Sequence, residues 1–94
     1  MESIIGIGSR GLDMSYVCPC CSYLTFDEEP PGTFEICAVC GWEDDEVQFR
    51  DSTYEGGANS VSLDQARKNF LVLGAMDKES LGSARKPLPE EIPS

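Results

Sequence analysis

Two cysteine pairs of the form C-x-x-C constrain this chain more than any other feature of its 94 residues. Fifteen residues lie between the two pairs. Each C-x-x-C turn places two sulfur atoms on one side of a tight knuckle, and two facing knuckles supply four thiolates at tetrahedral positions. The spacing is typical of a four-cysteine zinc site. We therefore predict one Zn²⁺ per chain, bound by Cys18, Cys21, Cys37 and Cys40.

The same cysteines are compatible with three other kinds of centre. A complete disulfide framework would not leave an odd number of cysteines, and this chain has five. A rubredoxin-like iron site uses the same four thiolates, and the spacing leaves it open; zinc is favoured because nothing else suggests electron transfer. A thioredoxin-like redox centre would account for the C-P-x-C within "CPCC", but it needs a helix after the first cysteine. The following stretch, "SYLTFDEEPPG", does not have a helical pattern.

Cys20 is a fifth thiol between two predicted ligands. Ligation by Cys20 would give C-x-C with Cys18 or an adjacent pair with Cys21, and neither forms the usual knuckle. One interpretation is a small residue at a crowded turn beside a closed metal site. The alternative is a reactive thiol, which would make the chain a thiol-redox or metal-handling protein. The acidic surroundings favour the first interpretation, because nearby carboxylates disfavour a reactive thiolate.

Acidic residues are concentrated in the middle of the chain, whose formal net charge is −10. Residues 27–55 hold ten acids and one base, for a balance of −9, and the remaining segments contribute −1. Such a surface repels phosphate backbones and anionic lipid, so we expect no nucleic-acid partner and no membrane partner. It suits a basic protein partner, whose identity the sequence does not give, or plain solubility.

The densest acidic run is "WEDDE", directly after the second cysteine pair. We predict a protein-interaction module that binds its partner through this acidic face. The candidate contact residues are Glu43, Asp44, Asp45 and Glu46. The alternative is a solvated acidic loop. A Ca²⁺ site is not expected there, because the spaced oxygen pattern of a Ca²⁺ loop is absent. We expect Trp42 to pack over the second knuckle as part of the core.

The residues needed for common catalytic mechanisms are scarce. The chain has no histidine, which removes serine–histidine and cysteine–histidine mechanisms. A catalytic zinc keeps an open coordination position, whereas four cysteines close it, so we do not expect an enzyme. Ile4, Ile5 and Ile7 form an apolar patch too short for a signal peptide, and no stretch approaches membrane-spanning length. We therefore expect a cytoplasmic protein, where thiols stay reduced.

The main helix is predicted to begin after Ser62 and to end at Gly74. Ser62 with Gln65 three residues later fits a capping box, and glycine is a common helix stop. Four apolar residues recur at helical spacing and form the predicted core-facing stripe. They are Leu63, Ala66, Phe70 and Leu73.

Shorter elements are predicted on both sides of this helix. Segments 15–18, 23–26 and 33–37 are rich in aromatic or β-branched residues and are expected to be extended. One helical turn is expected near 46–49, and a short second helix over 77–85.

Together these elements predict an α+β fold. It consists of a small zinc-ribbon-like antiparallel β module with two zinc knuckles, followed by one main helix and a short second helix. The expected boundaries are a loose N-terminal leader over 1–13, a cysteine-rich zinc-binding domain over 14–86 and a flexible Pro-rich tail over 87–94.

Three longer motifs contain or follow the cysteine pairs. They are "CPCCSYLTF" at 18–26, "PPGTFEICAVCGWEDDEVQ" at 30–48 and "GGANSVSLDQARKNFLVLGA" at 56–75. In these motifs the chain resembles the bacterial cysteine-rich CPCC family, and the resemblance covers roughly residues 16–87. The resemblance implies a small zinc-ribbon-like module followed by a helix, and it implies no particular activity.

Overall fold

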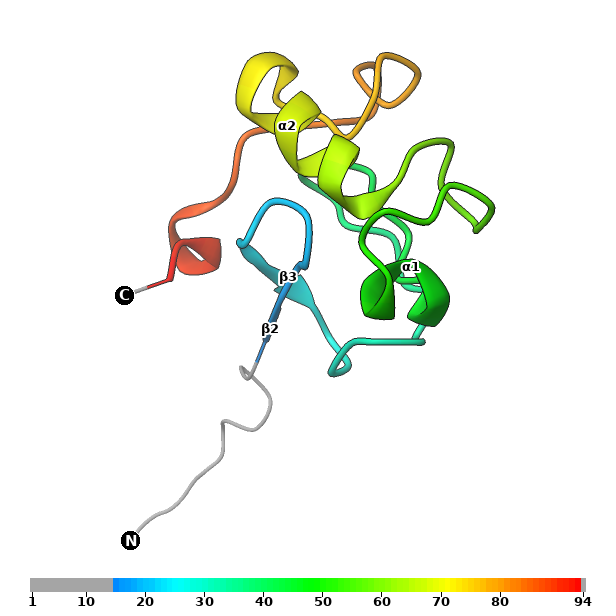
Figure 1. Cartoon of the computed structure of the whole chain (residues 1–94). Helices are drawn as coiled ribbons and strands as arrows, with labels where there is room; N and C mark the ends of the chain where they lie inside the picture. Colours follow the sequence, from blue (N-terminus) through cyan, green and yellow to red (C-terminus); the bar gives the residue numbers. More distant parts are fainter. Residues whose placement is uncertain (1–14, 94) are drawn as a thin grey trace, which may run out of the picture.

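The computed structural model describes residues 15–93, which form an α+β fold around the two cysteine pairs (Figure 1). Strands β2 (Tyr16–Val17) and β3 (Leu24–Phe26) make a two-stranded antiparallel sheet. Helices α1 (Glu46–Arg50) and α2 (Leu63–Leu73) follow, and a 3-10 turn, η2 (Pro89–Glu91), lies near the C-terminus. Within this described part, no helix combines the length and apolar character needed to span a membrane. The predicted leader over 1–13 lies outside the described residues.

The first cysteine pair occupies the turn of the hairpin that β2 and β3 form. Tyr16 pairs with Phe26, and Val17 pairs with Leu24. Aromatic and β-branched side chains favour such pleated pairing. The two extended segments predicted on either side of the first cysteine pair are therefore confirmed.

The second cysteine pair also occupies a hairpin turn, although its regular pairing is limited to one bridge, between Ile36 and Glu43. Next to this bridge, the N–H of Cys37 donates to the carbonyl of Trp42 at 2.9 Å. Side chains alternate along an extended chain, so Cys37 and Trp42 are buried while Ile36 is exposed. The third predicted extended segment forms only this bridge and no regular strand, because Phe34 has a left-handed backbone (φ 59°) that interrupts the extended chain.

The main helix, α2, begins and ends where the sequence predicts. The Oγ of Ser62 accepts a hydrogen bond from the N–H of Gln65 at 3.1 Å, and Gly74 ends the helix with a φ of 79°. The reciprocal bond of a capping box is replaced, since the side chain of Gln65 donates to Asn69 at 2.9 Å. Half of the predicted capping box is thus enough to start the helix.

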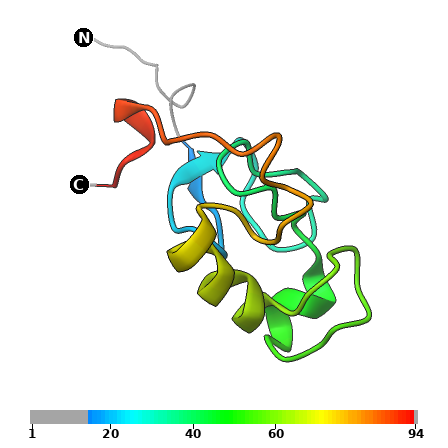
Figure 2. The ribbon, with the colours of Figure 1, turned by 90° about the horizontal axis from the view of Figure 1, so that it is seen from above.

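Three of the four residues in the predicted apolar stripe of α2 face the core. Leu63 and Ala66 are buried, and Phe70 is partly buried and packs against the core cluster. Leu73, in the last turn, is partly buried but is not part of this packing, so that part of the prediction is wrong. The ring of Phe70 meets the ring of Tyr23 edge-on, with centroids 6.1 Å apart, which joins the helix to the first hairpin. In Figure 2, α1 lies beside the N-terminal end of α2.

The predicted second helix over 77–85 is wrong, because this segment forms a series of turns. Asp77 does act as a cap, since its Oδ1 accepts a hydrogen bond from the N–H of Ser80 at 2.8 Å. On both sides of the turns, the N–H groups of Met76 and Arg85 donate to carbonyls of the second knuckle. A short segment tied down at both ends, with an internal glycine, gains too few hydrogen bonds to propagate a helix.

Part of the segment that we expect to be a flexible tail has a defined conformation. The turn η2 contacts β3. The guanidinium of Arg85 donates two hydrogen bonds to the carboxylate of Glu91, at 2.9 and 2.8 Å. A bidentate pair of this kind holds the chain near the first hairpin.

Gln48, a buried amide in α1, organises the loop between the two helices. Its Nε2 donates to the carbonyls of Tyr54 and Val61 at 3.1 and 3.0 Å. Its Oε1 accepts hydrogen bonds from the backbone and side-chain N–H groups of Asn59 at 3.1 and 2.9 Å. Both donors and both lone pairs of the amide are therefore used. A Cβ at Gly57 would lie 2.6 Å from the amide carbon, so only glycine fits there.

We expect Gln48→Ala to lower the free energy of unfolding by about 2–4 kcal/mol, because three loop residues lose their buried hydrogen-bond partner. Urea unfolding followed by circular dichroism, with metal in excess, measures the change. Gln65→Ala is the matched control: its side chain is exposed on α2, and the expected change is within about 0.5 kcal/mol. Equal losses in the two variants would contradict the role of Gln48.

Candidate metal centre

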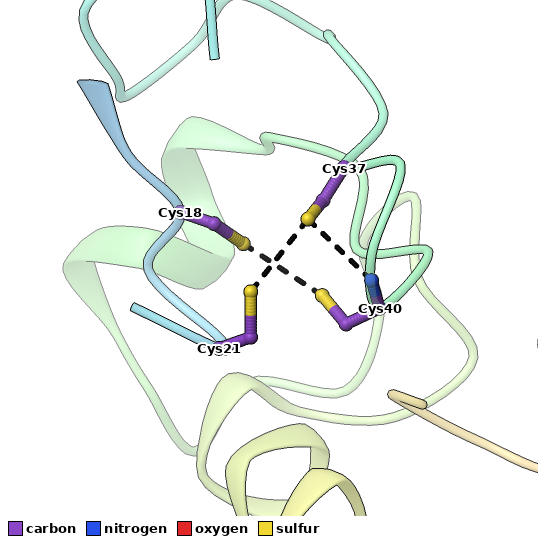
Figure 3. Close-up of side chains that lie close together, drawn as sticks. All are labelled: Cys18, Cys21, Cys37 and Cys40. Atoms are coloured by element: carbon purple, nitrogen blue, oxygen red, sulfur yellow. Dashed lines mark hydrogen bonds between the residues drawn. The ribbon is translucent and has the colours of Figure 1, made fainter. Parts of the chain in front are cut away.

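The two knuckles face each other and bring four sulfur atoms into one buried cluster (Figure 3). The Sγ atoms of Cys18 and Cys40 lie 3.7 Å apart, and those of Cys21 and Cys37 are also 3.7 Å apart. All four Sγ atoms lie within 4.8 Å of one another. These separations are far from a disulfide bond, whose sulfur atoms lie about 2.05 Å apart.

The size of the cluster fits a tetrahedral ion bound by four thiolates. Metal–sulfur bonds of about 2.3 Å give a tetrahedron whose sulfur–sulfur edges are about 3.8 Å. The two separations of 3.7 Å match that edge. The structure thus brings together the four cysteines predicted from the sequence into a site that can hold one metal ion. The same tetrahedron suits zinc and rubredoxin-like iron.

The sulfur of Cys37 has two hydrogen-bond partners. Thr25 Oγ1 lies 3.0 Å from it, and the N–H of Cys40 donates to it over 3.5 Å. Because Thr25 belongs to β3, the first hairpin reaches across the cluster to the second knuckle. A hydroxyl that donates to a thiolate orients the ligand and spreads its charge. Thr25 is not among the residues predicted from the sequence, because its only signal there is its place in the strand that leaves the first knuckle.

Gly41 permits the tight turn of the second knuckle. Its φ is 90°, and its N–H donates to the carbonyl of Cys37 at 2.9 Å. A Cβ at this position would lie 2.8 Å from the Cβ of Ser80, in the turns that follow α2. Both the backbone conformation and the packing therefore require glycine.

Crowding shifts the pKa values of the four thiols. Hydrogen bonding with Cys21 and Cys37, together with burial, raises the pKa of Cys18 far above its usual range. Hydrogen bonding with Cys18 likewise raises the pKa of Cys40. The contact with Cys18 lowers the pKa of Cys21, but the contacts with Cys37 and Cys40 raise it overall. Hydrogen bonds from Cys18, Cys21 and Cys40 hold the pKa of Cys37 well below its usual range.

Four thiolates therefore do not share this pocket without a cation. The raised pKa values of Cys18, Cys21 and Cys40 indicate that the neighbouring sulfurs and burial disfavour the loss of their protons. A bound dication replaces those protons and stabilises all four thiolates. Metal binding at this site releases protons, so it weakens as the pH falls.

Segments from the C-terminal half cover the cluster. Arg67 Nε donates to the carbonyl of Pro19 at 2.9 Å, which ties α2 to the first knuckle. The N–H of Met76 donates to the carbonyl of Cys40 at 2.8 Å, and Arg85 reaches the same knuckle. All four candidate ligands are buried. Four protein ligands in a covered site are typical of a structural rather than a catalytic metal.

Cys20 lies in the buried core but outside the four-sulfur cluster. Its exposed fraction is 5%. After Cys18, contact with the Cys20 thiol is the next largest cause of the raised pKa of Cys40. The thiol is thus placed beside the second knuckle rather than toward solvent, which fits the interpretation of a small residue at a crowded turn.

The four acidic residues predicted as partner contacts lie in different environments. They are Glu43, Asp44, Asp45 and Glu46. Asp44 is fully buried, and its Oδ2 accepts hydrogen bonds from the N–H and Oγ1 of Thr33 at 2.9 and 2.7 Å. Asp45 caps α1, and Glu46 pairs with Arg50 at 2.9 Å. Asp44 therefore belongs to the core and has no surface to offer a partner.

The fold and the site together define a small α+β protein built around a four-cysteine centre that can hold a metal. The family model described as "Cysteine-rich CPCC" matches residues 16–91. The chain therefore belongs to the cysteine-rich CPCC family, as its motifs predict. A comparison with curated proteins gives no match.

We expect Cys37→Ser to lose both metal and fold, because the apparent binding energy of structural zinc, about 10–16 kcal/mol, is also folding energy. Cys20→Ser should keep one metal ion per chain, because Cys20 lies outside the cluster. Elemental analysis and circular dichroism of the purified variants measure both outcomes. Full metal content in Cys37→Ser, or metal loss in Cys20→Ser, would show that the ligands are assigned incorrectly.

We expect Thr25→Val to release its metal to a chelator about tenfold faster than the parent chain, because the sulfur of Cys37 loses its hydroxyl partner. Thr25→Ser keeps the hydroxyl and is the matched control, with a release rate near that of the parent. The cobalt-substituted protein gives a second measurement, since its sulfur-to-metal absorption band should shift only in the valine variant. Identical behaviour of the two variants would mean that Thr25 acts only by filling space.

Proposed function

We propose that this chain is a protein-interaction module, stabilised by a structural zinc ion, that presents an acidic face to a basic protein. Nine of the ten acidic residues in 27–55 lie at least partly at the surface, and only Asp44 is buried. Arg50, the one base in this segment, pairs with Glu46. The nine surface acids and one base leave a balance of −8. A surface of one sign attracts a partner of the opposite sign and speeds its association.

Folding adds to this concentration of charge. The carboxylate of Glu35 accepts hydrogen bonds from the backbone N–H groups of Asp27 and Glu28, at 2.9 and 3.3 Å. This contact brings a further carboxylate to the acidic loop that follows β3. Four thiolates with one Zn²⁺ would add a formal charge of about −2 nearby. Plain solubility is the alternative use of such a surface.

We assign the metal as zinc and the compartment as the cytoplasm. A buried set of four cysteine ligands is one of the usual structural zinc sites, and zinc has no redox chemistry that would need a partner. The five unpaired thiols suit a reducing compartment. Elemental analysis with an absorption spectrum tests the metal, because a ferric tetrathiolate absorbs visible light and a zinc tetrathiolate does not.

The second candidate function, thiol-redox or metal-handling chemistry through Cys20, has less support. Its exposed fraction of 5% leaves little room for a second protein or a thiol reagent to approach. Titration of the metal-loaded protein with a thiol reagent separates the two candidates. Slow modification of Cys20 supports a structural role, whereas rapid modification of one thiol per chain supports redox chemistry.

For the acidic face, we expect the double variant Glu28→Gln with Glu43→Gln to bind a basic partner, recovered by affinity capture, about three- to thirtyfold more weakly. Neither carboxylate makes a hydrogen bond or an ion pair within the described residues, so the fold should be unaffected. The variant should also show a smaller loss of affinity between low and high salt. Isothermal titration at two salt concentrations measures both effects.

The matched control is the double variant Glu79→Gln with Glu90→Gln, which removes the same charge outside the acidic segment. Its two side chains are exposed. We expect nearly unchanged affinity for this control. Equal weakening in both double variants would indicate attraction by total charge alone, and no weakening in either would show that the acidity serves only solubility.

A further inference from the structure

An open groove lies between β2, the first knuckle, the loop after β3 and α1. Its volume is about 280 Å³. Six residues line it, namely Tyr16, Val17, Pro19, Glu29, Pro30 and Phe49. Figure 1 shows β2 and α1 on the lower side of the molecule, where the loop after β3 runs toward α1. The groove is therefore composed of segments that only the fold brings together.

The groove is apolar with one charge. Five of its six lining residues are aliphatic, aromatic or proline, and Glu29 is the sixth. Val17 and Phe49, which lie on different elements, are 44% and 40% exposed. Pockets for drug-sized ligands usually span about 300–1,000 Å³, so this groove suits one or two side chains better than a whole metabolite.

The groove lies within the acidic part of the surface. Glu29 follows Asp27 and Glu28 in the loop, and Glu35 is hydrogen-bonded to the same loop. The segment from Asp27 to Phe49 contains no lysine or arginine. Arg50, next to Phe49, pairs with Glu46, and the side chain of Arg67 donates to the carbonyl of Pro19. An anionic occupant would be repelled here, whereas a cation beside an apolar group would gain from both the charge and the aromatic rings.

We propose that this groove binds an extended segment of the basic partner, with an apolar or aromatic side chain in the groove and a lysine or arginine beside Glu29. The proposal rests on the proposed function and adds the chemistry of the partner's contact segment. Apolar anchors seated in a pocket and surrounded by polar contacts carry most of the energy in protein interfaces. The acidic face then provides attraction, and the groove provides the anchor.

The charges on this chain disfavour two other occupants. A second copy carries the same net charge of −10, so two acidic faces would repel each other. The N-terminal residues 1–14 contain two acids and one base, a balance of −1, so they offer no positive charge to Glu29. A basic segment of another protein is the occupant that complements both the charge and the apolar lining.

Titration of the ¹⁵N-labelled, zinc-loaded full chain with three capped peptides tests the proposal by NMR. The probes are Gly-Lys-Trp-Lys-Gly, Gly-Lys-Gly-Lys-Gly and Gly-Glu-Trp-Glu-Gly. We expect only the first peptide to shift the amide signals of Tyr16, Val17, Glu29 and Phe49. Val17→Ala and Phe49→Ala should each weaken its binding about five- to tenfold, because each removes apolar lining that a different element contributes to the groove.

Glu29→Gln should weaken binding of the first peptide about two- to fivefold and reduce its salt dependence. Leu71→Ala is the matched apolar control, since Leu71 is 84% exposed on α2, away from the groove lining, and this variant should bind like the parent. Val17→Ala and Phe49→Ala lie on separate elements, so the test remains valid if one of these substitutions perturbs the element that carries it.

Three results would overturn the proposal. The first is that Gly-Lys-Gly-Lys-Gly, the peptide without tryptophan, binds as tightly as Gly-Lys-Trp-Lys-Gly. The second is that the shifted amide signals belong to residues outside the groove. The third is an NMR contact to the Phe49 ring from the leader isoleucines or from a second copy, which would identify a different occupant. If the peptide titrations contradict binding in the groove while the Glu28 and Glu43 double variant still loses partner affinity, the proposed function stands and only the groove proposal is wrong. If that variant keeps full affinity, the proposed function fails.

Discussion

The convergence of four cysteine sulfurs on one point is the constraint on which the rest of this structure depends. Eleven buried residues form the core cluster, and five of them are cysteines. A chain of this length buries too little apolar surface to be very stable without additional cross-links. The apparent binding energy of a structural zinc, about 10–16 kcal/mol, is as large as the net stability of a typical domain, about 5–15 kcal/mol. A metal at this point therefore joins two hairpins that share little regular pairing.

Buried side-chain amides stabilise the part of the fold that does not contact the four-cysteine site. Asn59 Oδ1 accepts a hydrogen bond from the N–H of Glu43, and Asn59 Nδ2 donates to the carbonyl of Glu43, both at 2.8 Å. The side chain of Asn59 thus pairs with Glu43 as a neighbouring strand would. Gln48 then connects Asn59 to the rest of the loop between the helices. Fully satisfied polar networks of this kind fix one conformation, which explains how a chain with little regular structure remains ordered.

The features that local sequence determines were predicted correctly. The cysteine spacing predicts which sulfurs meet, because each C-x-x-C turn forms its knuckle from its own residues. Ser62 and Gly74 mark the ends of α2 because a cap acts within one helical turn. Burial of Asp44 and Gln48 could not be predicted, because each depends on partners eleven or more residues away or on a loop that only the fold places. The prediction of a second helix over 77–85 is wrong for the same reason, because both ends of this segment are hydrogen-bonded to the second knuckle.

A metal ion at the four-cysteine site would offset the cost of the surface charge of this protein. Like charges gathered on one surface repel each other and destabilise a compact chain, and the acidic segment of 27–55 contains the second knuckle. Burial of Asp44 adds a further cost, which its two hydrogen bonds from Thr33 offset only in part. A chain that relied on its small core alone would have little stability left after charge repulsion and the burial of Asp44. Because a metal ion held by four buried thiolates would be the strongest stabilising interaction, the surface residues would then be free to be selected for charge rather than for folding.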